Sequence, residues 1–142
     1  GCETEIGSDY IKITGKPMTG CPLDLNATPD ALPALAATAC YAEGETHLAN
    51  VPQARMKETD RIDVMTKELR KMGADITELG DGMIIRKSPL TGTDVKGHGD
   101  HRVVMALAIA ALQSEGTTRI DTAEAVDITF PGFFQRLNDV RE

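Results

Sequence analysis

The sequence predicts an α/β (α+β) fold made of two tandem copies of one βαβαββ-type unit. The first observation is a repeat of 72 positions: Gly44 matches Gly116, and Ala-Leu-Ala at 34–36 recurs at 106–108. Secondly, short polar–apolar alternations typical of strands are interleaved with longer helical patterns in both halves. Thirdly, one helical stretch in each half is apolar almost all round, as in helices buried between layers.

In this interpretation residues 1–142 form a single domain, with repeat one at about 1–72 and repeat two at about 73–142. Each repeat begins with two strands joined by a turn and continues with a third short strand. We expect these strands at residues 2–7, 10–14 and 22–26 of repeat one, and at residues 74–79, 83–87 and 93–97 of repeat two.

The apolar helix follows, at about residues 30–43 and 100–115. Small residues dominate both stretches, and Pro33 fits the first turn, where no intrahelical N–H partner is needed. Gly44 and Gly116 stand where a C′ glycine would end each helix.

A fourth strand and a second helix complete each repeat. We expect the strands at 46–51 and 118–122, and a helix at 58–72 in repeat one. That helix has one apolar stripe typical of packing on a sheet, namely Ile62, Met65, Leu69 and Met72. Repeat two ends in a shorter helix that contains Phe133, Phe134 and Leu137. The order β-β-β-α-β-α, twice, predicts a mixed sheet with one layer of buried helices.

Composition excludes several classes of protein. With 26% charged and 41% apolar residues, the 142-residue chain is typical of a soluble globular protein. Its net charge of −7 argues against nucleic acid as a partner, because phosphate backbones favour a surplus of Lys and Arg. The longest apolar run, 103–112, is too short for a bilayer, which needs about 20 residues, and no signal peptide is visible. We therefore expect no membrane partner either. The chain has three cysteines, Cys2, Cys21 and Cys40, and their spacing is not that of metal ligands. This odd number predicts no disulfide framework, no metal site and a reduced, cytoplasmic setting.

The beginning of the chain breaks the repeat. Gly73 ends the helical stretch at 58–72, whereas Gly1, its partner in the repeat, has nothing before it. The first copy therefore lacks the helix that precedes the second copy. We expect the chain to be a piece of a longer protein.

Charged residues at the start of the 100–115 helix indicate an anion site. Helix N-termini attract anions through free N–H groups and the macrodipole, so a cation there requires an explanation. Arg102 lies in that first turn, and an anionic ligand at the helix mouth would account for it. Asp100 has the alternative interpretation of an N-cap, and His101 is by itself a weak signal.

Repeat one has candidate residues at the starts of both of its helices. Asp30 is either an N-cap or a functional carboxylate. The second helix begins with three cations in an acidic protein, Arg55, Lys57 and Arg61, and one interpretation of them is an anion-binding site. The alternative is a weak exposed ion pair between Glu58 and Arg61, which are three residues apart.

Four segments are distinctive: Pro29-Asp30-Ala31, Arg55-Met56-Lys57-Glu58-Thr59-Asp60-Arg61, Gly99-Asp100-His101-Arg102 and Thr129-Phe130-Pro131-Gly132-Phe133-Phe134. Together they closely resemble the carboxy-terminal part of the 5-enolpyruvylshikimate-3-phosphate synthase family. Lys-Glu-Thr-Asp-Arg at the start of a helix is highly specific to that family, and the resemblance spans essentially the whole chain.

The resemblance implies an inverse α/β barrel of the enolpyruvyl transferase type, with six units in two lobes and this chain as part of one lobe. It implies transfer of the enolpyruvyl group of phosphoenolpyruvate to the 5-hydroxyl of shikimate 3-phosphate, releasing phosphate, in aromatic amino acid biosynthesis. By resemblance, Asp30 is the base at that hydroxyl, and Glu58 is the proton donor and acceptor at the phosphoenolpyruvate methylene. No metal or organic cofactor is implied.

The resemblance also implies substrate-binding residues and shows one departure. Lys57 would contact shikimate 3-phosphate, while Arg61 and Arg102 would clamp phosphoenolpyruvate. His101 would lie beside that clamp. Many family members carry a Lys just before the Thr/Ser-Phe/Tyr-Pro segment, where this chain has Ile128. We expect a difference in phosphoenolpyruvate affinity or inhibitor sensitivity.

The absence of the amino-terminal lobe, which would grip the shikimate phosphate, is the second departure, and it predicts negligible turnover by this chain alone. A UDP-N-acetylglucosamine enolpyruvyl transferase shares the fold, but it normally lacks the Lys-Glu-Thr-Asp-Arg segment. The remaining alternative is a non-catalytic domain that binds anions or a partner on the same scaffold. Retention of Asp30, Glu58, Arg61 and Arg102 weighs against it.

Overall fold

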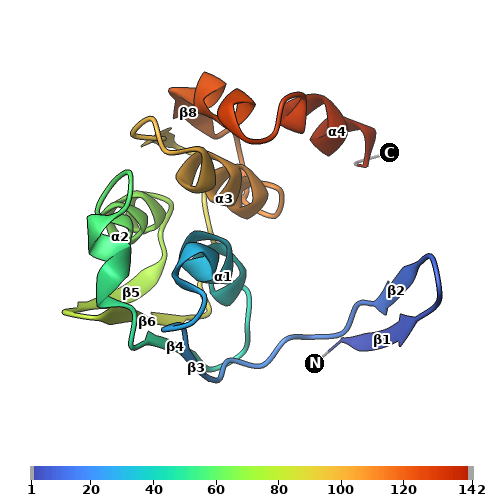
Figure 1. The fold of residues 1–142 in the computed structure, drawn as a ribbon. Helices are drawn as coiled ribbons and strands as arrows, with labels where there is room; N and C mark the ends of the chain where they lie inside the picture. The colour runs from blue at the N-terminus through green and yellow to red at the C-terminus, as the bar shows by residue number, and fades with distance from the viewer. Residues whose placement is uncertain (1, 141–142) are drawn as a thin grey trace.

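The computed structural model describes residues 2–140, and its elements follow the predicted order β-β-β-α-β-α in both repeats (Figure 1). Repeat one contains β1 (Glu3–Ile6), β2 (Ile11–Thr14), β3 (Pro22–Asp24), η1 (Pro29–Ala31), α1 (Leu32–Ala39), β4 (Glu45–Ala49), η2 (Pro52–Met56) and α2 (Arg61–Lys71). Repeat two contains β5 (Asp75–Leu79), β6 (Gly82–Arg86), β7 (Asp94–Lys96), α3 (His101–Ala111), β8 (Arg119–Asp121), η3 (Ala123–Ile128) and α4 (Phe133–Asp139). Gly1, the repeat partner of Gly73, lies outside the described residues.

The strands form three separate sheets rather than one. A mixed sheet has the order β3-β4-β6-β5, while β1-β2 is an antiparallel hairpin and β7-β8 a parallel pair. In each repeat the parallel pair is joined through a buried helix, α1 between β3 and β4 and α3 between β7 and β8. The repeat thus reappears in the strand pairing, and the hairpin of repeat two adds to the sheet of repeat one.

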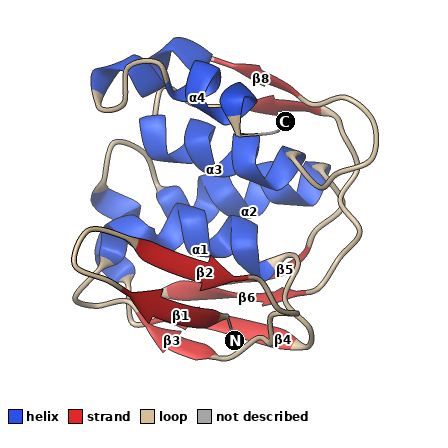
Figure 2. Ribbon diagram, turned by 90° about the vertical axis from the view of Figure 1, so that its right-hand side faces the viewer, coloured by secondary structure: helices blue, strands red, loops and turns tan. Residues whose placement is uncertain are grey.

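The two predicted buried helices, α1 and α3, pack against each other at the centre of the molecule (Figures 1 and 2). Small side chains let the two backbones approach closely, and Ala36, Ala106 and Ala110 are all fully or almost fully buried. Figure 2 shows α1 and α2 over the four-stranded sheet, with α3 above them and β8 and α4 beyond it. The amino-terminal ends of α1, α2 and α3 are consequently brought close to one another.

Both buried helices end earlier than predicted, at Ala39 and Ala111. Gly44 and Gly116 have left-handed φ values of 81° and 86°, but they lie beyond the helix ends and are not C′ residues. Tertiary pairing explains the shortening in repeat one. The amide of Glu43 donates to Met18 O at 2.8 Å, which holds the chain in an extended bridge before the helix could continue.

The second helix of repeat one, α2, begins at Arg61 rather than near residue 58, because Asp60 caps it by accepting a hydrogen bond from the Asp63 amide at 3.0 Å. Its carboxyl end is a Schellman motif: Gly73, with φ 98°, donates to Arg70 O, and Ala74 donates to Leu69 O. The predicted apolar stripe is confirmed, since its four members, Ile62, Met65, Leu69 and Met72, are fully buried.

The β1–β2 hairpin stands away from the helices (Figure 1). Its isoleucines, Ile6, Ile11 and Ile13, are exposed. Within residues 2–140, no helix has the length and apolar character that a membrane crossing requires.

Candidate active site

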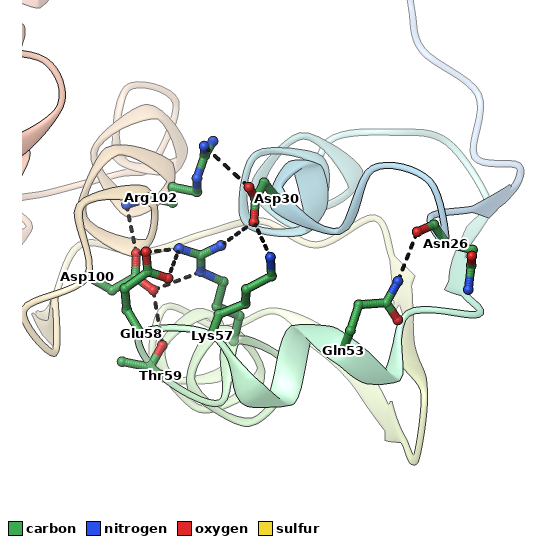
Figure 3. A network of polar contacts seen from close by, with 9 residues as sticks. Asn26, Asp30, Gln53, Lys57, Glu58, Thr59, Asp100 and Arg102 are labelled. Atoms are coloured by element: carbon green, nitrogen blue, oxygen red, sulfur yellow. Dashed lines mark hydrogen bonds and ion pairs between the residues drawn. The ribbon is translucent and has the colours of Figure 1, made fainter.

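Three short segments meet where the amino-terminal ends of α1, α2 and α3 converge. They are η1 with Asp30, residues 57–60 before α2, and residues 97–100 before α3. Figure 3 shows the side chains from these segments pointing toward one another. We call the group formed by Asp30, Lys57, Glu58, Arg61, Asp100 and Arg102 the Arg61 cluster.

Arg61 is the centre of this cluster and is 1% exposed. Its Nε donates to Asp100 Oδ2 at 2.8 Å and its Nη1 to Asp30 Oδ1 at 2.9 Å. Nη2 donates to Glu58 Oε2 at 2.6 Å and to Asp100 Oδ1 at 3.2 Å. A buried guanidinium requires such partners, because removing its charge from water is costly. Although burial opposes the charged form, the hydrogen bonds and ion pairs with Asp100, Glu58 and Asp30 raise the pKa of Arg61 above its ordinary value.

Asp100 is fully buried and has two tasks. It is the predicted N-cap of α3, since its carboxylate accepts from the Arg102 amide at 2.9 Å. The same carboxylate binds Arg61 and accepts from Thr59 Oγ1 at 3.2 Å. Burial alone would raise the pKa of the Asp100 carboxyl, but these contacts lower it below the ordinary value.

Asp30 is not the N-cap that was the alternative interpretation, because it lies inside η1 and α1 has no side-chain cap hydrogen bond. Its carboxylate instead contacts three cations: Arg61 Nη1 at 2.9 Å, Lys57 Nζ at 3.2 Å and Arg102 Nη2 at 3.6 Å. Although partial burial opposes ionisation, Lys57, Arg102 and Arg61 together lower the pKa of Asp30. Asp30 is therefore an ionised carboxylate held in a cationic pocket.

Glu58 forms the predicted ion pair with Arg61, but from the loop before α2 rather than from within the helix. Its side chain is 52% exposed, and Arg61 is the partner of its carboxylate. Lys57 and Arg102 are also accessible in part, with 30% and 41% of their side chains exposed. The accessible face of the cluster thus presents Lys57, Arg102, Asp30 and Glu58, while Arg61 and Asp100 form its buried base.

Two other predicted residues take different positions. His101 begins α3 and is buried, and within the part of the chain that the structure describes its ring joins no hydrogen bond of the cluster. Arg55, counted with the cations of this segment, turns away and binds Asp60, Glu78 and the carbonyls of the β5–β6 turn. It is a structural residue, and its sequence position gave no sign of that.

A cleft of about 230 Å³ runs from the cluster between the two buried helices. Asp30 and Arg102 lie at its charged end, and the rest of its lining is mainly apolar: Ala34, Thr38, Met105, Ala106 and Ile109. A wider hollow of about 670 Å³ lies beyond the carboxyl ends of the same helices, lined by Glu43, Glu115 and Lys87 among others. We place the candidate site at the cleft, because the predicted residues gather there.

Sequence reasoning missed the task of Asp100 as a partner of Arg61, and it missed Thr59. Thr59 lies within the distinctive Lys-Glu-Thr-Asp-Arg segment, which was the available signal.

Among residues 2–140, no group of three or more His, Cys, Asp or Glu is arranged to hold a metal ion. What the cluster can do chemically is bind anions with Lys57 and Arg102 and move protons with Asp30 and Glu58.

A family model described as EPSP synthase (3-phosphoshikimate 1-carboxyvinyltransferase) matches residues 1–137. A 3-phosphoshikimate 1-carboxyvinyltransferase of Ruminiclostridium cellulolyticum is 59% identical over 135 residues, covering 95% of this chain and 32% of that protein. One from Acetivibrio thermocellus is 57% identical over 138 residues, covering 97% of this chain and 33% of that protein. The chain therefore spans about a third of the length of the curated relatives it matches.

Solved structures agree with these matches. An EPSP synthase from Acinetobacter baumannii superimposes with a TM-score of 0.84 at 33% identity, covering 96% of this chain and 34% of that chain. The enolpyruvyl transferase NikO from Streptomyces tendae has a TM-score of 0.80 at 21% identity, covering 98% of this chain and 32% of that chain. The likeness to NikO shows that this chain shares the fold of that enzyme.

Proposed function

Since the chain belongs to the EPSP synthase family, we propose that it supplies part of the active site of a 3-phosphoshikimate 1-carboxyvinyltransferase. The reaction transfers the enolpyruvyl group of phosphoenolpyruvate to the 5-hydroxyl of shikimate 3-phosphate and releases phosphate. The matched relatives are about three times as long, which supports the view that further substrate contacts come from an amino-terminal lobe outside these 142 residues. Turnover by the chain alone would then be negligible.

One observation carries the proposal. Two carboxylates from different helix ends, Asp30 and Glu58, share the guanidinium of Arg61 at 2.9 and 2.6 Å, with Lys57 and Arg102 beside them. A base and an acid are thereby held next to cations at the end of a cleft. Addition and elimination on an anionic enol phosphate require that combination.

In the addition step the 5-hydroxyl oxygen of shikimate 3-phosphate forms a bond to C2 of phosphoenolpyruvate. The hydroxyl proton passes to Asp30, and the methylene carbon receives a proton from Glu58, which gives a tetrahedral ketal. In the elimination step the bond from C2 to the phosphate oxygen breaks, and phosphate leaves with the proton that Asp30 had taken. Glu58 then takes a proton back from the methyl group, which restores the double bond.

The free cluster is charge-balanced, with three carboxylates against Lys57, Arg61 and Arg102. Anionic substrates must therefore displace one of these carboxylates from its cation. Glu58 is the candidate, because it is half exposed and is bound through Arg61, whereas Asp100 is fully buried and held by several groups. A substrate carboxylate that takes this place on Arg61 would release Glu58, which would then take up a proton from solvent and deliver it to the methylene carbon.

Asp30 benefits from the same exchange. A carboxylate surrounded by three cations is a weak base, as the lowered pKa of Asp30 indicates. Anions that draw Lys57 and Arg102 toward themselves would leave Asp30 a stronger base at the moment when the hydroxyl is in place. We assign shikimate 3-phosphate to Lys57 and phosphoenolpyruvate to Arg61 and Arg102. His101, in the same first turn as Arg102, would support that clamp.

The setting we propose is the cytoplasm, without a nucleic acid or membrane partner and without a metal or organic cofactor. All three cysteines, Cys2, Cys21 and Cys40, are free, which supports a reducing compartment. The net charge of −7 supports small anionic substrates bound by local charge rather than a polyanion.

A chimera tests the proposal. In it, this chain replaces the matching third of the Ruminiclostridium cellulolyticum protein, and phosphate release from the two substrates is followed. We expect activity within about tenfold of that protein, because the two sequences are 59% identical there. A folded chimera that binds both substrates and releases no phosphate would instead favour a non-catalytic binding domain.

A further inference from the structure

Glu68 is a buried carboxylate outside the Arg61 cluster. It lies on α2, is 2% exposed, and contacts three groups. Its Oε2 accepts from the Lys96 amide at 2.9 Å and from Lys71 Nζ at 2.6 Å, and its Oε1 lies 3.0 Å from His98 Nε2. Burial favours the neutral acid, but Lys71, His98 and the Lys96 amide lower the pKa of Glu68. Burying a charged carboxylate costs free energy unless it is paired, so these three contacts are needed to stabilise Glu68.

Two of these contacts fall on residues 96–100, which run from the last residue of β7 to the N-cap of α3. His98 has a left-handed φ of 54°, and Gly99 follows with 68°. Such a backbone is unfavourable for His, which has a Cβ, so the surrounding structure must hold it in place. The hydrogen bond between the imidazole and Glu68 is one such restraint, and the Lys96 amide bond is another.

The same segment ends at Asp100, which binds Arg61. Because positions 61 and 68 are seven residues apart on α2, they lie on one side of that helix. α2 therefore contacts both ends of the segment: Glu68 binds its first residue, Lys96, and Arg61 binds its last, Asp100. On the other side, the Gly97 amide donates to Asp121 Oδ1 at 2.8 Å.

We propose that Glu68 is a positioning residue for the Arg61 cluster, acting through the 96–100 segment. By fixing Lys96 and His98 it sets the place of Asp100, and Asp100 in turn sets the orientation of the Arg61 guanidinium. Within the described residues, no hydrogen bond or ion pair joins Glu68 to a member of the cluster. The inference concerns the protein before substrate binds, so it is independent of the proposed reaction.

The test follows the Nε–H of Arg61 in the 142-residue chain by ¹H–¹⁵N spectroscopy. This proton is buried and bonded to Asp100, so its exchange with water reports the Asp100–Arg61 contact directly. In Glu68→Gln we expect its exchange to become at least tenfold faster, together with that of the Lys96 amide. The matched control is Asp63→Asn, which removes a partly exposed carboxylate of the same helix that pairs with Lys67.

A second variant keeps the test decisive if Glu68→Gln does not fold. His98→Asn retains a residue that tolerates left-handed backbone but is too short to replace the ring contact with Glu68. We expect it to accelerate exchange of the Arg61 Nε–H as well. Wild-type exchange rates at Arg61 in a folded Glu68→Gln or His98→Asn chain would overturn the inference. An inactive chimera would count against the proposed reaction alone.

Discussion

The carboxylate of Asp100 binds the guanidinium of Arg61 through two nitrogens, at 2.8 and 3.2 Å, and both side chains are buried. The amino-terminal end of α2 is thereby locked to that of α3. Asp30 and Glu58 then attach to the same guanidinium from the accessible side. Arg61 therefore stabilises the fold through Asp100 and also holds the two carboxylates of the proposed reaction. Substitutions in the cluster should accordingly be of two kinds: those that unfold the chain and those that only affect the reaction.

Asp100→Ala should destabilise the chain by about 3 kcal/mol, because it leaves Arg61 buried with fewer partners and removes the cap of α3. Urea unfolding of the 142-residue chain measures this. Asp63→Asn, which breaks a partly exposed pair with Lys67, should change the free energy of unfolding by less than about 0.5 kcal/mol. Equal effects of the two substitutions would mean that burial of the Asp100–Arg61 pair is unimportant.

Stability should fall in acid. The pKa values of Asp100 and Glu68 are lowered in the folded chain relative to ordinary values of 3.8 and 4.5. The unfolded chain therefore binds protons first as pH falls. The stabilisation is complete above about pH 5 and is lost as pH decreases through the folded values. Urea unfolding between pH 7 and pH 3 should show this loss, and Asp100→Asn should flatten it. A stability that rises as pH falls would contradict the assignment.

Glu58→Gln in the chimera should lower kcat by about 10²–10⁴, because a positioned acid and base is lost. The KM for phosphoenolpyruvate should stay the same or fall, since the substrate no longer competes with a charged Glu58 for Arg61. Steady-state phosphate release measures both constants. Glu45→Gln, an exposed residue paired with Arg86, serves as the control. Unchanged turnover with a raised KM would count against Glu58 as the proton donor.

Ile128→Lys in the chimera should lower the KM for phosphoenolpyruvate about fivefold, a gain of about 1 kcal/mol from one added exposed cation. Ile128 ends η3 and is 74% exposed, so a Lys fits there without displacing the core. The gain should shrink at high salt, because exposed charges are screened. A KM that does not respond at low salt would show that position 128 does not face the substrate.

Local patterns account for much of the fold and for less of the site. The buried stripe of α2 follows from helical periodicity, and Asp60 and Gly73 bound that helix through chemistry within a few residues of its ends. The early end of α1 depends on Glu43 meeting Met18, a contact between distant segments that periodicity does not contain.

The site depends on such distant contacts even more. Arg61 resembled a surface cation in a charged segment, and it is buried only because residues 30, 58 and 100 come from three different helix ends to surround it. Asp100 was recognised as a cap, since capping is local, but its bond to Arg61 spans 39 positions. The predicted roles of the site residues came from family resemblance, and they remain predictions for the chimera to test.

The isolated β1–β2 hairpin has a practical consequence for handling the protein. It presents Ile6, Ile11 and Ile13 to solvent on a short two-stranded ribbon, which is a template for aggregation between chains. A shortened chain that begins at Lys16 should scatter less light on concentration. Its thermal midpoint should not change, because the hydrophobic core begins after the ribbon, at Leu25.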